Sequence, residues 1–410
     1  MHSRKEPNGS DAPDSRDGWF GRRTLLAGAG ALSMGSLALG SLATARPASA
    51  APAGDRTHHD GRYRRRAVAA YDALRKFFRD PDTGYYLEEY PRVSENPWCY
   101  VWPYSQAMIA GQCMAGIPGI GPRYRRYVER DYRVLEDYWN AETDPPGYDS
   151  YLRPPHGQGG DKFYDDNEWI ALGLLQRHQM HGGRLERAAE IFDLVVFGWD
   201  DDPSHPCPGG VFWTQADWSR DRNTISNGPG AQVGLHLAMA TGQRSRLDWA
   251  LRMYEWTRGC LLAPNELYWD HIDLEGNIEK TQWSYNQGVM IGAGELLYRA
   301  TGKKRYLQQA RRTAEAALAY YADGKYWEQP ARFHAIFFAN LLRLWTITHD
   351  ERYRTAMRDY ADEAYERFVD RSTGLYRFEG DEPVTLLEQA GMVRIQAMSA
   401  WSPRDYTKLT

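Results

Sequence analysis

Two adjacent carboxylates, Asp165 and Asp166, are the feature of this sequence best suited to chemistry. They precede the apolar run 170–175, a pattern that predicts the start of a buried helix. Neighbouring residues on a helix point about 100° apart, so both carboxyl groups can reach one bound molecule. Two carboxyl groups about 5 Å apart serve retaining glycosidases as nucleophile and general acid/base, whereas inverting enzymes hold theirs farther apart. The pair therefore indicates acid/base chemistry at a sugar linkage.

The same pair also has a purely structural interpretation. Two acids at a helix N-terminus often cap the helix and interact favourably with its dipole. The surroundings favour chemistry, because Tyr164 and Trp169 flank the pair and similar polar and aromatic residues recur at other predicted helix starts. We therefore take Asp165 and Asp166 as the candidate catalytic residues.

The elements that must position this pair repeat with a period of about sixty residues. Short polar turns separate consecutive amphipathic segments, so neighbouring helices must run antiparallel. The outer segments open with Arg followed by Tyr or Leu, at Arg62, Arg123, Arg184, Arg246, Arg305 and Arg352. The segments between them are apolar around most of their circumference and predict buried inner helices at roughly 103–116, 165–181, 228–241, 286–301, 331–348 and 384–400.

Six outer and six inner helices predict an all-α fold, an (α/α)6 barrel. An open helical solenoid fits the same period, but six pairs is the number that closes, and the inner helices lack a solenoid's polar concave face. The outer-to-inner connections are long and contain Gly with Tyr, Phe or Trp, as at 84–86 and 210–213. These loops must gather at one end of the barrel, where the inner helices begin, and function is expected there.

Amide, acid and aromatic side chains recur at these helix starts and in the loops before them. Aromatic faces stack on sugar rings, while amides and carboxylates hydrogen-bond with hydroxyl groups. The chain has 15 Trp and 27 Tyr against 12 Phe, an excess of rings that carry a polar group. The candidate substrate-binding residues are Trp102, Tyr164, Asn167, Trp169, Trp213, Asn227, Trp269, Asp270, Trp283, Tyr285, Asn286, Gln287 and His334.

Some of these candidates have a second interpretation. His334 lies one turn into a predicted inner helix and fits either substrate contact or a hydrogen-bonded core histidine. Asp270 and Asp273 are assigned to sugar hydroxyls, although they are the alternative source of a catalytic carboxylate. His178 and His181 have the HxxH spacing but lie at the far end of their helix, so we expect no metal and no cofactor.

Composition narrows the class of partner. Without residues 1–50 the chain has 44 basic and 50 acidic residues, a net charge of −6, which argues against nucleic acid or anionic lipid as the main partner.

The four cysteines permit up to two disulfides and have no metal-ligand spacing; they are Cys99, Cys113, Cys207 and Cys260. No linker divides the chain after about residue 60, so we expect one catalytic domain over 61–405 and a monomer.

Residues 1–50 have the pattern of an export signal. Arg22 and Arg23 precede an apolar run rich in Gly and Ala, and 48–50 reads Ala-Ser-Ala, a typical cleavage site. The paired arginines favour the twin-arginine route, although Gly21 stands where Ser is usual and leaves the general secretory route open. The Gly and Ser content of the run disfavours a membrane anchor. We therefore expect a secreted protein, extracellular or periplasmic, with a flexible mature start at 51–60 and no membrane attachment after cleavage.

Three segments resemble one known family. FYDDNEWIALGLL at 163–175 is similar to the signature of glycoside hydrolase family 76, the endo-α-1,6-mannanases and their fungal cell-wall relatives. NGPGAQVGLHLAMATG at 227–242 and SYNQGVMIGAGELLYRATG at 284–302 resemble its second and third inner-helix motifs. The resemblance covers residues 60–405. It implies an (α/α)6 barrel, no metal, and retaining hydrolysis with Asp165 as nucleophile and Asp166 as acid/base.

The resemblance thus predicts endo-acting cleavage of α-1,6-mannosidic linkages in α-mannan or manno-oligosaccharides. Gly228 departs from the family pattern, which often has Ala there, and the connection with Trp213, Asp217 and Trp218 is the chain's own. Transglycosylation onto a cell-wall glycan remains an alternative, because both reactions share a glycosyl-enzyme. A sugar epimerase would need a second histidine opposite His334, for which the sequence offers only His271. A non-catalytic glycan-binding barrel would have no use for the acid pair.

Overall fold

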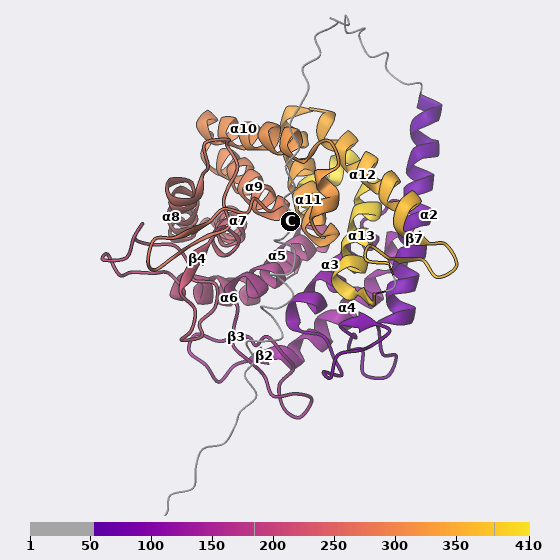
Figure 1. Cartoon of the computed structure of the whole chain (residues 1–410), viewed down its shortest axis with the longest axis horizontal. Helices are drawn as coiled ribbons and strands as arrows, with labels where there is room; N and C mark the ends of the chain where they lie inside the picture. The colour runs from indigo at the N-terminus through magenta and orange to yellow at the C-terminus, as the bar shows by residue number, and fades with distance from the viewer. Residues whose placement is uncertain (1–52, 184, 381) are drawn as a thin grey trace, which may run out of the picture. The chain divides into compact units, whose positions relative to one another are not determined.

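The computed structural model describes residues 53–183, 185–380 and 382–410, with side chains from residue 61 onward (Figure 1). The export signal predicted at 1–50, and Arg184, lie outside these residues. The described helices alternate between an outer and an inner layer. The outer helices are α2 (Ala53–Phe77), α4 (Arg125–Leu135), α6 (Glu186–Phe197), α8 (Arg244–Leu261), α10 (Lys304–Tyr321) and α12 (Arg352–Phe368). The inner helices are α3 (Val101–Ala115), α5 (Tyr164–His181), α7 (Thr224–Thr241), α9 (Ser284–Thr301), α11 (Ala331–Thr348) and α13 (Leu386–Ser399).

The inner helices form a closed ring. Each packs against the next in chain order, and α13 returns to pack against α3 (Figure 1). The outer helices cover this ring from outside, with α2 against α13 and α3, and α8 against α7 and α9. The (α/α)6 barrel is therefore confirmed, and the contact between α13 and α3 rules out the open solenoid.

The two layers follow from their side-chain patterns. Every residue of α3 is buried, as expected for a helix that is surrounded on all sides. The outer helix α10 instead buries one stripe, which includes Tyr306, Ala310 and Ala314, and exposes its charged residues. Short 3-10 helices lie at η1 (Gly121–Arg123), η2 (Glu136–Tyr138), η3 (Lys325–Glu328) and η4 (Pro403–Lys408).

Glycines let the inner helices approach closely. A Cβ atom at Gly288 of α9 would lie 2.7 Å from the Cα atom of Phe337 in α11, and the backbone there cannot move aside. A Cβ atom at Gly228 of α7 would lie 2.5 Å from Val289 Cγ2 of α9. The departure from the family pattern at Gly228 therefore coincides with a close approach of α7 and α9.

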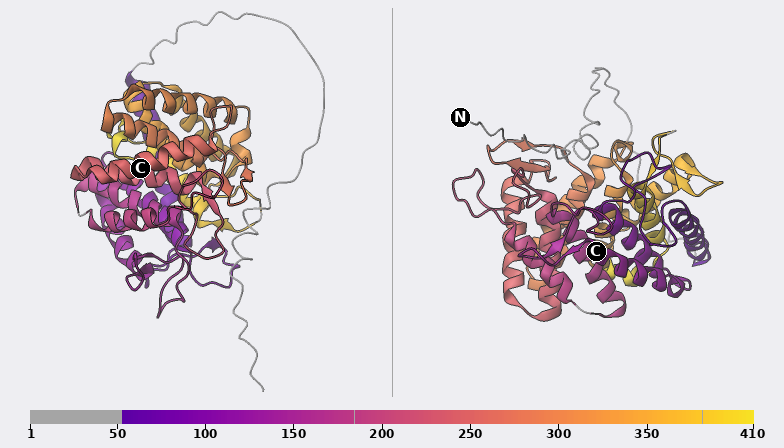
Figure 2. Two further views of the ribbon diagram at one scale, coloured as in Figure 1. Left: turned by 90° about the vertical axis from the view of Figure 1, so that its left-hand side faces the viewer. Right: turned by 90° about the horizontal axis from the view of Figure 1, so that it is seen from below.

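The long loops gather at one end and carry the short strands. In chain order these are β1 (Glu89–Tyr90), β2 (Trp139–Asn140), β3 (Gly147–Tyr148), β4 (Asp221–Asn223), β5 (His271–Asp273), β6 (Ile278–Glu279), β7 (Val369–Asp370), β8 (Leu375–Tyr376) and β9 (Val384–Thr385). They form the antiparallel pairs β1–β9, β2–β3 and β7–β8 and the three-stranded sheet β4–β5–β6. In the right-hand view of Figure 2 these loops lie along the upper edge of the ring. They border the starts of the inner helices.

The start of the first described helix differs slightly from expectation. Helix α2 begins at Ala53, inside the segment 51–60, so regular structure starts ahead of residue 61. The domain limits and the behaviour of 51–60 stay predictions. Among the described residues, no helix combines the length and apolar character needed to cross a bilayer.

One disulfide joins Cys207 and Cys260, while Cys99 and Cys113 are buried free thiols. The bond ties the loop between α6 and α7 to the last turn of α8 and spans 53 residues of sequence.

Cross-linking a loop of this length restricts the unfolded chain, so replacing both Cys207 and Cys260 with Ser should lower the free energy of unfolding by about 4 kcal/mol. Denaturant unfolding with and without a reductant measures this. The reductant should destabilise the wild type and leave the double variant unchanged; an equal response of both would contradict the assignment.

Candidate active site

Asp165 and Asp166 are the second and third residues of α5, at the end where the long loops gather. They are 2% and 1% exposed, so both carboxyl groups lie in a recessed position. Asp165 Oδ1 accepts a hydrogen bond from the backbone N–H of Asp166 at 3.0 Å. The N-terminal end of the α5 dipole adds a favourable field beside the two acids. This end of the helix can therefore stabilise a buried negative charge.

The loop between α6 and α7 holds the start of α5. The backbone N–H of Tyr164 donates to Trp213 O at 2.9 Å, and the rings of Phe163 and Trp213 lie 4.9 Å apart. Thr214 Oγ1 donates to Lys162 O at 2.7 Å. Trp213 therefore lies against the start of α5, which carries the acid pair, and its contact with substrate stays a prediction.

The end of the barrel where the long loops gather and the inner helices begin is its mouth. Tyr164 does not point into the mouth. A Cβ atom at Gly198 would lie 2.4 Å from Tyr164 Cζ, so the ring packs against the end of outer helix α6. Burial raises the pKa of Tyr164 to about 12. The sequence placed this ring among the substrate contacts because it adjoins Asp165, but one helical step turns it outward.

An aromatic cluster from α3, α9 and α11 lies at the mouth. Phe333 is at its centre, with its ring centroid 4.0 Å from Tyr285 in a stacked arrangement, 5.4 Å from Trp283 and 6.4 Å from Trp102. Three of the predicted binding residues are thus brought together by a phenylalanine that the prediction left out. The Arg332 guanidinium lies 5.9 Å from the centroid of the Trp102 ring and pairs with a carboxylate of α13.

The fourth residue of the inner helices has a recurring structural task. Asn167 Oδ1 accepts from Tyr148 N at 2.8 Å and its Nδ2 donates to Tyr148 O at 3.0 Å. Gln287 holds Tyr268 in the same way, at 2.7 and 2.9 Å. Asn227 and Gln389 likewise accept from Val211 N and Tyr376 N, at 2.9 and 3.0 Å.

These amides are therefore used by the backbone of the loops. Asn167, Asn227 and Gln287 were predicted to read sugar hydroxyls, but each is fully buried and bonded to main-chain groups. The sequence could not separate the two roles because an amide at a helix start suits either one. We assign the three residues to holding the loops that border the mouth.

His334 occupies the fourth position of α11 and likewise binds the backbone of the segment that precedes its helix. Its Nε2 lies 2.8 Å from Tyr326 O, and its Nδ1 lies 2.9 Å from Ser284 Oγ. Nε2 must donate to the carbonyl, and in the neutral ring Nδ1 is then the acceptor. Burial lowers the pKa of His334 to about 4. His334 is thus a core histidine, which removes one of the two histidines that an epimerase would need.

Asp270 lies at the mouth between α7 and α9. Its Oδ1 accepts from Asn286 Nδ2 at 3.0 Å, and its Oδ2 lies 3.0 Å from His271 Nδ1. Burial lowers the pKa of His271, but the hydrogen bond and charge of Asp270, with nearby carboxylates, outweigh it and raise the pKa overall. Asp270 is one-fifth exposed, so this polar network can meet a ligand at its rim.

The remaining predicted residues lie at different depths. Trp169 is buried one turn below the acid pair, and Trp269 is half-buried with Lys280 Nζ 5.6 Å from the centroid of its ring. Comparing equal positions along the repeat would have found Phe333, the third residue of α11, as the counterpart of Asp166. Among the described residues, no group of His, Cys, Asp and Glu has the arrangement of a metal site.

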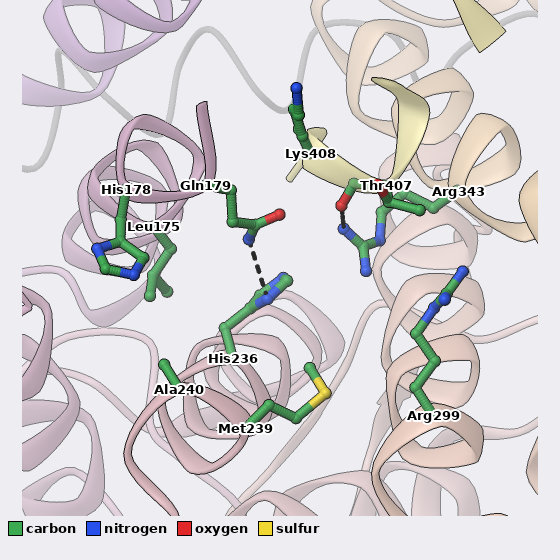
Figure 3. A pocket seen from close by; sticks show the side chains of 10 residues that line it. All are labelled: Leu175, His178, Gln179, His236, Met239, Ala240, Arg299, Arg343, Thr407 and Lys408. Atoms are coloured by element: carbon green, nitrogen blue, oxygen red, sulfur yellow. Dashed lines mark hydrogen bonds between the residues drawn. The ribbon is translucent and has the colours of Figure 1, made fainter. Parts of the chain in front are cut away.

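A separate cavity of about 580 Å3 lies at the opposite end of the ring (Figure 3). The last turns of α5, α7 and α9, a residue of α11 and η4 line it. Its arginines are already engaged: Arg343 binds Glu295 at 2.9 Å and the carbonyl groups of Thr407 and Leu409, and Arg299 also pairs with Glu295. This end of the barrel is held together by ion pairs, so the candidate site is the acid pair at the loop end.

The fold and the candidate site together define the class of this protein, a closed (α/α)6 barrel with two adjacent buried carboxylates at its loop end. The model of glycosyl hydrolase family 76 matches residues 63–374, and the chain belongs to this family.

Similar proteins share parts of the chain or its fold. Mannan endo-1,6-alpha-mannosidase DCW1 of Saccharomyces cerevisiae is 31% identical over 153 residues, which are 35% of this chain and 33% of that protein. The match thus spans about a third of the length of this relative. A family 76 glycoside hydrolase (mannosidase) from Bacteroides thetaiotaomicron has the same fold, with a TM-score of 0.73, 22% identity and coverage of 83% of this chain and 98% of that chain.

A second solved structure is an inactive variant of an alpha-1,6-mannanase of Salegentibacter sp. in complex with alpha-1,6-mannotriose. Its two consecutive aspartates are replaced by asparagine. It has a TM-score of 0.68 and 20% identity, and the match covers 82% of this chain and 99% of that chain.

Proposed function

We propose that this protein is a retaining glycoside hydrolase that cleaves α-1,6-mannosidic linkages within mannan. The observation that carries the proposal is the buried pair Asp165 and Asp166 at the loop end of the barrel, beside Trp213. The relatives named as α-1,6-mannan hydrolases support the linkage, and the inactive double-aspartate variant of one supports the role of the pair. The aromatic cluster around Phe333 is suited to stacking on sugar rings.

The proposed reaction has two steps. The Asp165 carboxylate attacks the anomeric carbon from the face opposite the leaving oxygen, and Asp166 donates its proton to that oxygen as the bond breaks. Water then gives a proton to Asp166 and attacks the same carbon, which releases Asp165. Two inversions leave the α configuration unchanged. The side chains emerge on different sides of the first turn of α5, as two roles on one carbon require.

The transglycosylase alternative for the same site has a specific consequence. A transglycosylase would pass the sugar from the glycosyl-enzyme to a glycan hydroxyl in place of water, so products longer than the substrate would accumulate. The net charge and the predicted export signal favour a secreted monomer that acts on polysaccharide and binds neither nucleic acid nor membrane.

Product sizing tests the proposed function. Incubation with linear α-1,6-mannan should give short manno-oligosaccharides of mixed length from the earliest time, because an endo-acting enzyme cuts within the chain. Branched yeast mannan and an α-1,6-glucan serve as controls, and the glucan should not be cut. Release of mannose alone would contradict endo action, and cleavage of the glucan alone would contradict the assignment of the sugar.

A further inference from the structure

Glu168 is a third carboxyl group in the first turns of α5. It follows Asp165 by three residues, so the two side chains lie on the same side of the helix. Glu168 is 0% exposed, and no side chain among the described residues hydrogen-bonds with its carboxyl oxygens. The proposed reaction assigns no task to it.

The packing of the ring makes this glutamate unexpected. The fifth residue of the inner helices is small elsewhere: Ser105, Gly228, Gly288, Ala335 and Ala390. Two of these positions have no room for a Cβ atom, because the inner helices approach closely there. Only α5 places a long polar side chain at this position among the described inner helices. A buried polar group that breaks a packing pattern indicates a functional site.

The surroundings of Glu168 contain one nearby charge. Its Oε1 lies against Gly230 of α7, where a Cβ atom would come within 2.8 Å of it. The next two atoms nearest to that Cβ position are Val195 Cγ1 of α6 and Met253 Sδ of α8, which carry no charge. Burial raises the pKa of Glu168 well above its usual range, and the charge of Asp165 raises it further. The Gly230 amide offsets only part of this rise.

We propose that Glu168 is a positioning residue that holds a proton beneath Asp165, so that the third carboxyl group of this turn stays uncharged while Asp165 is an anion. This inference rests on the proposed function, because it takes Asp165 as the nucleophile. A second negative charge on the same side of the helix would repel Asp165 and would need water that this apolar pocket does not supply. Loss of the proton therefore displaces the start of α5 and lowers activity.

Stability should report this proton. The folded chain binds it more tightly than the unfolded chain does, so its contribution is fully present below the usual Glu pKa of about 4.3 and is lost as pH rises through the raised pKa. Glu168→Gln carries no charge at any pH and keeps the shape of the protonated acid. The midpoint of thermal unfolding of Glu168→Gln should therefore rise relative to wild type as pH increases from about 5.

Activity provides the second measurement. An aryl α-mannoside with a good leaving group makes little demand on the general acid, so its pH profile isolates the effect of Glu168 from that of Asp166. Glu168→Gln should stay active at pH 5. The alkaline decline of its kcat/KM should occur at a pH about one unit or more higher than in wild type. The matched control is Glu295→Gln, which removes a buried carboxylate that Arg343 pairs with at 2.9 Å at the other end of the barrel. It should lower the unfolding midpoint at every pH and leave the alkaline limb unchanged.

Two results would overturn the proposal. One is a folded Glu168→Gln variant that is inactive at every pH, because the carboxylate itself would then be required. The other is an alkaline limb and a pH dependence of unfolding identical to those of wild type. Should the Gln variant fail to fold, Glu168→Met, of similar volume and uncharged, is measured in its place. Wild type that cuts no mannoside would contradict the proposed function alone, since the unfolding measurement needs no substrate.

Discussion

Replacing Asp165 with Asn is expected to abolish turnover of mannan and of aryl mannosides alike, with kcat lowered by about 10⁴-fold or more. Asn is isosteric with Asp, but its amide cannot form the covalent ester with the anomeric carbon. The Oδ1 atom that accepts from Asp166 N at 3.0 Å is retained, so the start of α5 should keep its geometry. Rates on both substrates and the unfolding midpoint check this result.

A control variant separates chemistry from folding. Asp362→Asn breaks ion pairs with Arg62 and Arg66 between α12 and α2, far along the chain from α5. It should leave kcat unchanged and lower stability slightly, since partly exposed pairs contribute about 1 kcal/mol or less. An Asp165→Asn variant that works within tenfold of wild type would show that another group is the nucleophile, and Asp270 would be the next to test.

The helical repeat was readable from the sequence because its signals are local. Amphipathic stripes and short turns fix antiparallel pairs, and six pairs close a ring, so the inner helices end within a few residues of the predicted limits. The acid pair was found for the same reason: Asp165 and Asp166 lie at the start of a strongly apolar helix.

The roles of the neighbouring polar residues were not readable in the same way. Asn167 and Gln287 bond to backbone groups 19 residues earlier, and such partners are set by how the loops fold. Phe333 became part of the mouth only because α9 and α3 bring Tyr285 and Trp102 against it. Sequence spacing predicts which end of a helix a residue occupies, whereas its direction around the helix axis decides between the mouth and the loops.

Asp166 should respond to substitution differently from Asp165, because its proton matters only as much as the leaving group needs it. Asp166→Asn is expected to lower kcat/KM on mannan by about 10²- to 10⁴-fold, since the departing sugar alkoxide is a poor leaving group. On an aryl mannoside with a good leaving group, the first step should remain close to wild type. A comparison of kcat/KM on the two substrates measures the difference.

Azide then distinguishes the two roles by stereochemistry. With Asp166→Ala, azide needs no general base and attacks the glycosyl-enzyme from the side that water would take, so the mannosyl azide should keep the α configuration. With Asp165→Ala, azide occupies the space of the missing carboxylate and attacks from the opposite face, so the product should be the β azide. Nuclear magnetic resonance of the isolated products gives the configuration at the anomeric carbon. The reverse pattern would exchange the two assignments, because azide keeps the α configuration only when the other carboxylate of the pair has formed the glycosyl-enzyme.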